Sequence, residues 1–414
     1  MNQFKNISRY ELFFPISMWL ASRIFICIAM LIIAPLFKPG AQGWHVFSCW
    51  DSTFYERITT YGYDYLINQK ELVFIVFFPL LPLLTRALMN LGLPFEVAGT
   101  LVNNLAFLGA AIVLYAWMSD RHGVGVARWT TSVLLWSPLS LFGTVIYAEG
   151  LYLLFSTAAL RAFDKKQYTL TALWGALATS SRPTGIALIP ALFLVTAIER
   201  RGIKAYIASI AAGSGLFLFS LYCQIKLGDP LAFLDQQKAW RPKLGFDWVH
   251  WWKMLMQIVV GSTNWKYGYI RDFLHPVLFV VIITSGFLLW LLSQKLSTRN
   301  IQYGFFGLGL SLWLLAGDPL TNIVMIFGGI YLLWLVRDTV SSITVVYGFC
   351  GITMLLASGG TISLNRLAYG IVSLSVALGL VLARHRRAGY AVICIFSIIL
   401  ASFAVRFAQG QWVA

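Results

Sequence analysis

Apolar stretches long enough to cross a lipid bilayer recur from one end of the chain to the other, and short loops carrying lysine and arginine separate them. Of the 414 residues, 59% are hydrophobic and only 11% are charged. A soluble globular domain has roughly 25% charged residues, so this composition excludes a single water-soluble domain. We therefore expect an all-α polytopic membrane protein.

The basic residues are explained first by the orientation of the chain in the membrane, and only second by an anionic binding partner. The chain has 31 Lys and Arg against 16 Asp and Glu, a formal net charge of +15. A nucleic-acid-binding protein gathers its charge on one solvated face, whereas these bases lie in short loops, as the positive-inside rule describes. We expect no nucleic-acid partner; affinity for anionic lipid or a phosphate-bearing substrate is the second interpretation. Lys5 and Arg9 precede the first apolar run, so we expect a cytoplasmic N-terminus.

About thirteen transmembrane segments fit between the basic loops. In chain order they are roughly 13–36, 97–118, 129–147, 149–163, 168–182, 184–198, 205–223, 273–293, 301–316, 319–336, 339–357, 367–383 and 389–406. They leave two long outer loops and place Trp412 outside. The expected parts are an N-terminal transmembrane module (1–223) with the first outer loop (37–96), an aromatic-rich outer loop (224–272) and a C-terminal transmembrane module (273–414).

The apolar segment 72–92 does not fit this count as a span. The first helix exits outward and Arg121 must be cytoplasmic, so only one of 72–92 and 97–118 can cross the membrane. Pro79 and Pro82 interrupt the helical hydrogen bonds of 72–92. We therefore expect a re-entrant or surface-lying helix within the first outer loop.

The first outer loop contains a carboxylate beside tryptophan, in Trp50-Asp51-Ser52. A tryptophan face can stack on the C–H face of a sugar ring, and a partly desolvated Asp suits general-base catalysis on a hydroxyl. The structural alternative places Trp50 in the interfacial aromatic belt and makes Asp51 a helix cap. His45, in the same loop, is either a substrate contact or a hydrogen-bonding loop residue.

Glu149 and Arg182 are expected at the outer ends of neighbouring spans. An Arg at the membrane surface can form bidentate hydrogen bonds to a lipid-linked phosphate. Alternatively, Arg182 reaches the lipid headgroups and Glu149 caps a helix junction. Arg23 lies deep in the first span, where it either helps to hold an anionic substrate or pairs with backbone carbonyls in the bundle.

Trp240 belongs to the aromatic-rich loop 224–272, where amide and carboxamide donors stand among many aromatic rings. Such a loop fits a platform for a glycan or a lipid headgroup. The alternative is an amphipathic helix whose aromatic residues lie at the membrane interface.

A series of motifs runs through the N-terminal half, and the C-terminal half adds one more at the outer start of a helix. The motifs are Trp50-Asp51-Ser52, Phe-Phe-Pro-x-x-Pro at 77–82, Ser137-Pro138 running to Tyr147-x-Glu149, Arg182-x-x-Gly185 and Asn365-Arg366-x-x-Tyr369. This series resembles that of the PIG-V type mannosyltransferases, which belong to the GT-C class of membrane glycosyltransferases. A bacterial homologue is favoured because the loops are compact.

Two positions depart from the family's pattern. Cys49 stands where an Arg is common, and Pro183-Thr184 replaces Ser-Asn after Arg182. These departures bear on the choice of substrate more than on the class.

The resemblance implies a GT-C type helical bundle with surface-lying helices in the first outer loop. It also implies a polyprenyl-phosphate sugar donor, favouring mannose, and a glycolipid or glycan acceptor on the extracytoplasmic face, in a bacterial plasma membrane. Asp51 maps onto the family's essential acid and would act as the general base of an inverting transfer. Arg182 and Arg366 would steady the phosphate. The other candidate substrate-binding residues are His45, Trp50, Glu149, Trp240 and Tyr369.

Other functions remain open from the sequence: a polytopic transporter, a lipid-linked glycan polymerase or ligase, or a noncatalytic mannosyltransferase subunit. No motif demands a cofactor. A divalent metal held by Asp51 with Glu149 is the one alternative considered.

Overall fold

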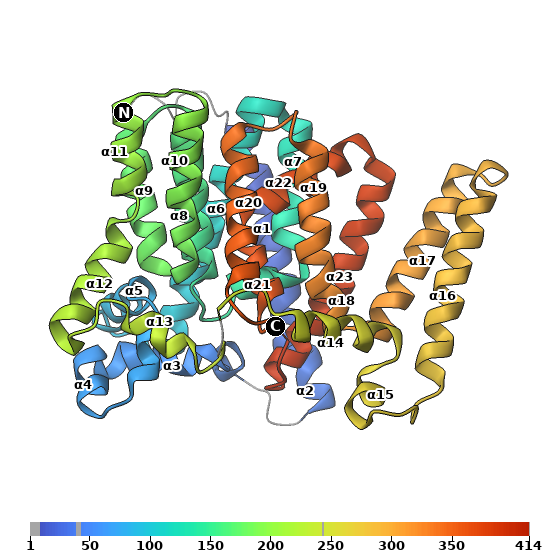
Figure 1. Cartoon of the computed structure of the whole chain (residues 1–414), viewed down its shortest axis with the longest axis horizontal. Helices are drawn as coiled ribbons and strands as arrows, with labels where there is room; N and C mark the ends of the chain where they lie inside the picture. The colour runs from blue at the N-terminus through green and yellow to red at the C-terminus, as the bar shows by residue number, and fades with distance from the viewer. Residues whose placement is uncertain (1–8, 39–42, 242–243, 414) are drawn as a thin grey trace.

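The structure, a computed structural model, describes residues 9–38, 43–241 and 244–413 (Figure 1). These residues are mostly helical and form no β-strand, apart from an isolated bridge between Gly245 and Ser358. The all-α class is confirmed. Lys5, on which the expected cytoplasmic N-terminus partly rests, lies outside the described residues.

The helices follow one another closely along the chain. The α-helices are α1 (Arg9–Ile28), α2 (Ala34–Phe37), α3 (Asp51–Tyr61), α4 (Tyr63–Asn68), α5 (Leu80–Met89), α6 (Phe95–His122), α7 (Val124–Trp136), α8 (Glu149–Asp164), α9 (Tyr168–Ser181), α10 (Leu188–Ile198), α11 (Ile203–Ala211), α12 (Ser214–Leu227), α13 (Ala232–Gln237), α14 (Trp248–Val259), α15 (Ser262–Tyr267), α16 (Leu274–Leu291), α17 (Thr298–Ala316), α18 (Asp318–Ile323), α19 (Gly329–Val336), α20 (Ser342–Ala357), α21 (Leu364–Tyr369), α22 (Val372–Arg384) and α23 (Arg386–Ala408). Shorter 3-10 or π-helical turns are η1 (Ala29–Ile33), η2 (Trp44–Phe47), η3 (Leu72–Val76), η4 (Pro138–Gly143), η5 (Pro183–Ala187), η6 (Leu292–Gln294) and η7 (Val324–Gly328).

Within the described residues, five helical stretches are long and apolar enough to span a membrane, and the chain is an integral membrane protein. A sixth span results if α11 and α12, which meet at a bend of 43°, are counted as one. The expected count of about thirteen is not confirmed, because other apolar helices, such as α8 and α20 with 16 residues each, fall short of the roughly 20 residues of a full span. The five stretches are Leu12–Phe37, Phe95–His122, Leu274–Gln294, Asp318–Val336 and Arg386–Ala408.

Besides the expected span 205–223, which is bent between α11 and α12, two further expected spans are interrupted. The expected helix 129–147 ends at Trp136, because Ser137 precedes a proline and adopts an extended ψ of 142°. A buried 3-10 turn, η4, then leads to α8. The expected span 367–383 likewise begins inside α21 and continues as α22 after a break.

Arg23 fastens the η4 turn. Its guanidinium donates hydrogen bonds to the carbonyl oxygens of Ser140 at 2.9 Å and Leu135 at 3.2 Å, and to the hydroxyl of Thr144 at 2.5 Å. Of the two interpretations of Arg23, the structure agrees with the pairing to backbone carbonyls, because the guanidinium donates its hydrogen bonds within the helical bundle.

Asn103 on α6 ties the same turn to α8. Its side-chain amide donates to the carbonyl oxygens of Phe142 at 2.8 Å and Val145 at 2.6 Å, and its oxygen accepts from the N–H of Gly150 at 2.8 Å. A Cβ added at Gly150 would meet the backbone oxygen of Asn103 at 2.4 Å, so glycine allows α6 and α8 to approach closely. This contact fixes the start of α8, where Glu149 lies.

Short helices cover one end of the bundle. In Figure 1, α3, α4, α13 and α14 lie across the lower end of the long helices, beyond the exit of α1. Helix α5, in the segment expected not to cross, has 10 residues, too few to span a bilayer alone.

Candidate active site

An ion pair joins two segments that are 315 residues apart in the chain. Asp51 begins α3, and Arg366 lies on the short helix α21. The Nη1 of Arg366 donates to the Oδ2 of Asp51 at 2.7 Å. The Asp51 side chain retains 21% of its exposure, so it is held by a cation yet still reachable from outside.

Arg366 also contacts a second carboxylate. Its Nε lies 3.3 Å from the Oε1 of Glu149, and the Nη1 of Arg182 lies 2.5 Å from the same oxygen. The side chain of Glu149 is only 1% exposed. The four groups therefore form a chain of alternating charge, Asp51–Arg366–Glu149–Arg182, and such burial is tolerated only because each charge has an opposite neighbour.

Hydrogen-bonding capacity is left over in this cluster. Glu149 Oε1, Arg182 Nη1 and Arg366 Nε are buried and close to opposite charges, but none of them is aligned for a hydrogen bond. Buried polar atoms without a hydrogen bond are uncommon in proteins, and a catalytic role or a bound water or ion is among the explanations for them.

Asp51 is positioned by the backbone around it. The preceding residue, Trp50, has φ 59° and ψ −116°, a rare conformation for a bulky side chain. The N–H of Asp51 donates to the hydroxyl of Tyr147 at 3.3 Å, and the hydroxyl of Ser52 donates to the carbonyl of Ile146 at 3.0 Å. The start of α3 is thus attached to the segment that leads into Glu149.

The electrostatic environment keeps Arg366 charged. Burial lowers the pKa of the Arg366 guanidinium, but the carboxylates of Asp51 and Glu149 raise that pKa by more. Its plane also lies over the rings of Tyr147, at 5.0 Å, and Phe142, at 5.4 Å.

Arg241 is a further cation near this cluster that the sequence interpretation did not single out. It donates to the hydroxyl of Ser358 and, at 2.9 Å, to the carbonyl of Ile362, which fastens the aromatic-rich loop beside α21. Burial first, and then the charges of Arg366 and Arg182, lower the pKa of Arg241 to about 10. The structure shows no carboxylate partner for Arg241 within the described residues. In the sequence, the feature that could have pointed to Arg241 is its position next to Trp240 in an expected outer loop.

Aromatic side chains surround the charges. Trp240 meets the stacked pair Phe54 and Phe77 edge-on, with ring centroids 6.2 Å from each. Trp50 meets Trp412 edge-on at 5.1 Å. Trp412 was expected on the outer side, but its contact with the candidate site was not foreseen, because only the fold brings the segment after α23 to Trp50.

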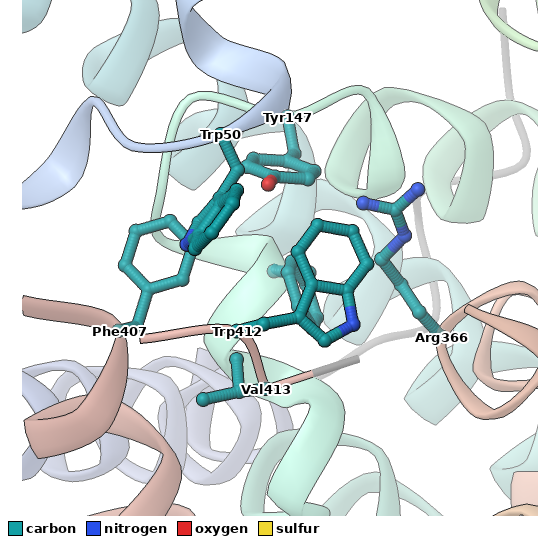
Figure 2. Close-up of a pocket in the computed structure, with 7 residues that line it drawn as sticks. Trp50, Tyr147, Arg366, Phe407, Trp412 and Val413 are labelled. Atoms are coloured by element: carbon teal, nitrogen blue, oxygen red, sulfur yellow. The ribbon is translucent and has the colours of Figure 1, made fainter. Parts of the chain in front are cut away.

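A small hollow lies beside Arg366 (Figure 2). It is shallow and nearly filled by its own lining, with no room for a water molecule. Its lining is aromatic and apolar apart from the one guanidinium and the polar edges of the rings. The lining residues are Trp50, Phe142, Tyr147, Arg366, Phe407, Trp412 and Val413.

Two candidate residues have other partners. The Nδ1 of His45 lies 3.3 Å from Glu96 on α6, and the His45 side chain is 86% exposed. Tyr369 is buried and donates to the carbonyl of Leu134 at 2.8 Å. The structure gives neither residue a hydrogen bond or ion pair to Asp51 or Glu149 within the described parts of the chain.

The carboxylates do not fit a divalent metal. Arg366 contacts both Asp51 and Glu149, so a guanidinium lies where a metal bridging them would need to be. The described residues also bring together no group of three or more His, Cys, Asp or Glu that could hold a metal ion.

Comparisons with known proteins give a family model that matches part of the chain and solved structures with a similar fold. The chain is similar to the crystal structure of the Archaeoglobus fulgidus oligosaccharyltransferase complex with Zn and sulfate, with 12% identity and a TM-score of 0.46, over 94% of this chain and 53% of that one. The chain thus spans about half the length of that solved protein.

No curated protein matches. The family model for mannosyltransferase (PIG-V) matches residues 41–212. The resemblance to the PIG-V mannosyltransferases, drawn from the motifs around Asp51, Glu149 and Arg182, is therefore confirmed over that range.

Proposed function

We propose that the chain is a membrane glycosyltransferase that moves a hexose, with mannose favoured, from a polyprenyl-phosphate sugar to a glycolipid or glycan acceptor. The proposed site opens on the extracytoplasmic face of a bacterial plasma membrane, the side on which the basic loops do not lie. The observation that carries the proposal is the alternating cluster Asp51–Arg366–Glu149–Arg182. Three of its groups lie in the family-matched range, and Arg366 comes from the C-terminal part of the chain.

The reaction needs a base on the acceptor side. Asp51 accepts the proton of the acceptor hydroxyl while that oxygen attacks the anomeric carbon from the face opposite the phosphate. The new C–O bond forms as the bond between the anomeric carbon and the phosphate oxygen breaks, and the electron pair leaves with the polyprenyl phosphate. The sugar is transferred with inversion. A phosphate leaves readily as an anion, so the site requires no general acid.

The formal charge around the cluster matches such a donor. The four groups of the cluster are neutral together, and the neighbouring Arg241 adds one positive charge that no carboxylate compensates within the described residues. A polyprenyl-phosphate sugar is a phosphodiester with one negative charge. Binding the donor therefore compensates that charge, and the charge that builds on the phosphate oxygen during transfer meets guanidinium donors already in place.

Arg366 links donor binding to the base. In the structure its Nη1 holds Asp51, so a carboxylate oxygen that should receive a proton is already occupied. An arriving phosphate competes for the same guanidinium. We infer that donor binding draws Arg366 away from Asp51 and frees the carboxylate for the acceptor hydroxyl.

The proposal is tested by Asp51→Asn in a transfer assay with labelled polyprenyl-phosphate-mannose and membrane glycolipids. The substitution preserves size and removes the base, so we expect transfer to fall by at least about a hundredfold. Glu56→Gln is the matched control, because Glu56 lies on the same helix with an exposed side chain. Undiminished transfer by a folded Asp51→Asn variant would remove Asp51 from the reaction, and a wild-type protein that transfers no mannose would contradict the proposed activity.

A further inference from the structure

Tyr55 follows Asp51 by one turn of α3, so the two side chains lie on the same side of that helix. The residue is only 7% exposed. Its ring meets the ring of Phe77 edge-on, with the centroids 5.2 Å apart. Packing therefore holds the tyrosine in place, while the partly exposed carboxylate of Asp51 marks the side from which a ligand can approach.

The hydroxyl group of Tyr55 makes no hydrogen bond within the described parts of the chain. Two other tyrosines of this region have partners. Tyr63 donates to the carbonyl of Phe77, and the hydroxyl of Tyr147 accepts from the N–H of the residue that begins α3. A buried tyrosine hydroxyl usually finds a partner. That of Tyr55 is therefore free for a group that the protein itself does not supply.

The charged cluster acts on this hydroxyl. Burial raises the pKa of the Tyr55 hydroxyl, so the group keeps its proton and remains a hydrogen-bond donor. Of the charges that also act on this pKa, the guanidinium of Arg182 has the largest effect and the carboxylate of Glu149 the next largest. Asp51 and Arg366 act more weakly. In electrostatic terms the hydroxyl thus belongs to the Arg182 end of the cluster.

Phe77 connects Tyr55 to the loop that carries Arg241. The ring of Phe77 meets not only Tyr55 but also Trp240, with centroids 6.2 Å apart and the rings nearly perpendicular. Arg241 follows Trp240 directly in the chain. One aromatic ring therefore lies against both the tyrosine and the segment that supplies the unpaired cation.

The arginines near Tyr55 favour an anion. After burial, the charges of Arg366 and then Arg182 are what lower the pKa of Arg241, so the three cations are close enough to repel one another. Arg241 has no carboxylate partner in the part of the chain that the structure describes. The buried Nη1 of Arg182 also lacks an aligned hydrogen bond. An anionic oxygen would reduce the repulsion and accept from these donors.

We propose that Tyr55 is a substrate-binding residue whose hydroxyl donates a hydrogen bond to the phosphate of the donor, beside Arg182. The assignment rests on the proposed function, which supplies the phosphate. The hydroxyl adds a donor without adding a charge, so one negative charge still suffices to compensate Arg241. A sugar hydroxyl could also accept from Tyr55, but it would leave the arginines without a counter-ion.

The test separates the phosphate from the sugar. Citronellyl phosphate, a short isoprenoid phosphate, and citronellyl phosphate mannose are titrated by calorimetry into the wild type, Tyr55→Phe and Tyr61→Phe in a maltoside detergent, which carries no phosphate. Citronellol corrects for partition into the micelle. Tyr55→Phe removes one oxygen and keeps the ring, and thermal unfolding checks that the variant is folded. Tyr61 is the matched control, because it ends the same helix, is 54% exposed and stacks on Tyr65.

We expect Tyr55→Phe to bind both ligands roughly tenfold more weakly, because a hydrogen bond to a charged acceptor is lost, and Tyr61→Phe to stay within about twofold of the wild type. Unchanged affinities in a folded Tyr55→Phe variant would overturn the proposal, as would equal losses in the two variants or a wild type that binds neither ligand. A loss confined to the mannosylated ligand would overturn it too, because Tyr55 would then contact the sugar.

This binding assay contains no acceptor, so its result is separate from that of the transfer assay. Tyr55-dependent binding of both ligands by a protein that transfers no mannose would support the phosphate contact and contradict the proposed transfer.

Discussion

The region that carries the candidate site and the hairpin α16–α17 differ in how closely their helices pack against the rest of the protein. Helix α8 has most of its residues buried, and polar contacts from α6 fix its start. Helix α16 has no buried residue, and in Figure 1 the hairpin stands apart from the main bundle. In lipid, apolar side chains gain little from leaving the surface, so close packing marks the region where geometry matters rather than the region that is most hydrophobic.

The largest effect should follow from removing Asn103. In Asn103→Ala, the carbonyl of Phe142 and the N–H of Gly150 lose their partners, while the Val145 carbonyl keeps the N–H of Tyr147. With two buried groups left unsatisfied, we expect a loss of about 2–6 kcal/mol in the free energy of unfolding. Thr284→Ala on α16 removes a hydroxyl that bonds only to its own helix and should change stability by less than about 0.5 kcal/mol. Thermal unfolding in nanodiscs measures both, and equal shifts would erase the contrast between the regions.

A smaller effect is expected from adding one methyl group to each region. In Gly150→Ala the new Cβ would meet Asn103 at 2.4 Å, so α6 and α8 must separate, at about 1–3 kcal/mol. In Gly307→Ala on α17 the Cβ meets nothing within 4 Å, so the better helix propensity of alanine should leave stability unchanged or raise it by up to about 1 kcal/mol. Mannose transfer should fall only in Gly150→Ala; a stable and active Gly150→Ala variant would show that the close approach is dispensable.

The smallest effect is expected at the exposed ion pair between Asp64 and Lys226, which joins α4 to α12. Hydrogen bonds from Lys226 and then Tyr222 lower the pKa of Asp64 on α4. Because the folded pKa lies below the unfolded one, the pair stabilises the protein above about pH 4, and that contribution is lost as the pH falls through the folded value. Asp64→Asn should therefore cost at most about 0.5 kcal/mol at pH 7, with the difference shrinking in acid. A deficit that stays the same in acid would exclude the ion pair as its cause.

Sequence patterns pointed to individual residues of the candidate site but not to the contacts between them. Asp51, Glu149 and Arg182 could be selected because a charged residue at the end of an apolar run stands out. The contact between Arg366 and both carboxylates could not, since 315 residues separate Arg366 from Asp51 and no periodicity relates them. Trp412 was missed for the same reason.

The helices themselves were easier to locate than their interruptions. Apolar length gave most of them, but hydropathy does not distinguish a buried turn from a span when both are apolar. The segment 138–148 is as buried as a helix would be, yet Pro138 ends the α-helical pattern before it. The same ambiguity explains why the expected number of spans exceeds the number of helices that are long enough to cross a bilayer alone, so the count of about thirteen stays unconfirmed.

The hydrogen bonds of Arg23 have a consequence for biosynthesis. Arg23 enters the membrane with the first helix, but Ser140, which accepts one of its hydrogen bonds, is synthesised 117 residues later. At roughly 5–20 residues per second, the ribosome needs about 6–23 s to supply that acceptor. An arginine without partners is expensive in hydrocarbon. The first helix is therefore expected to wait at the insertion machinery, where water can solvate the guanidinium, and to move into lipid together with the η4 turn.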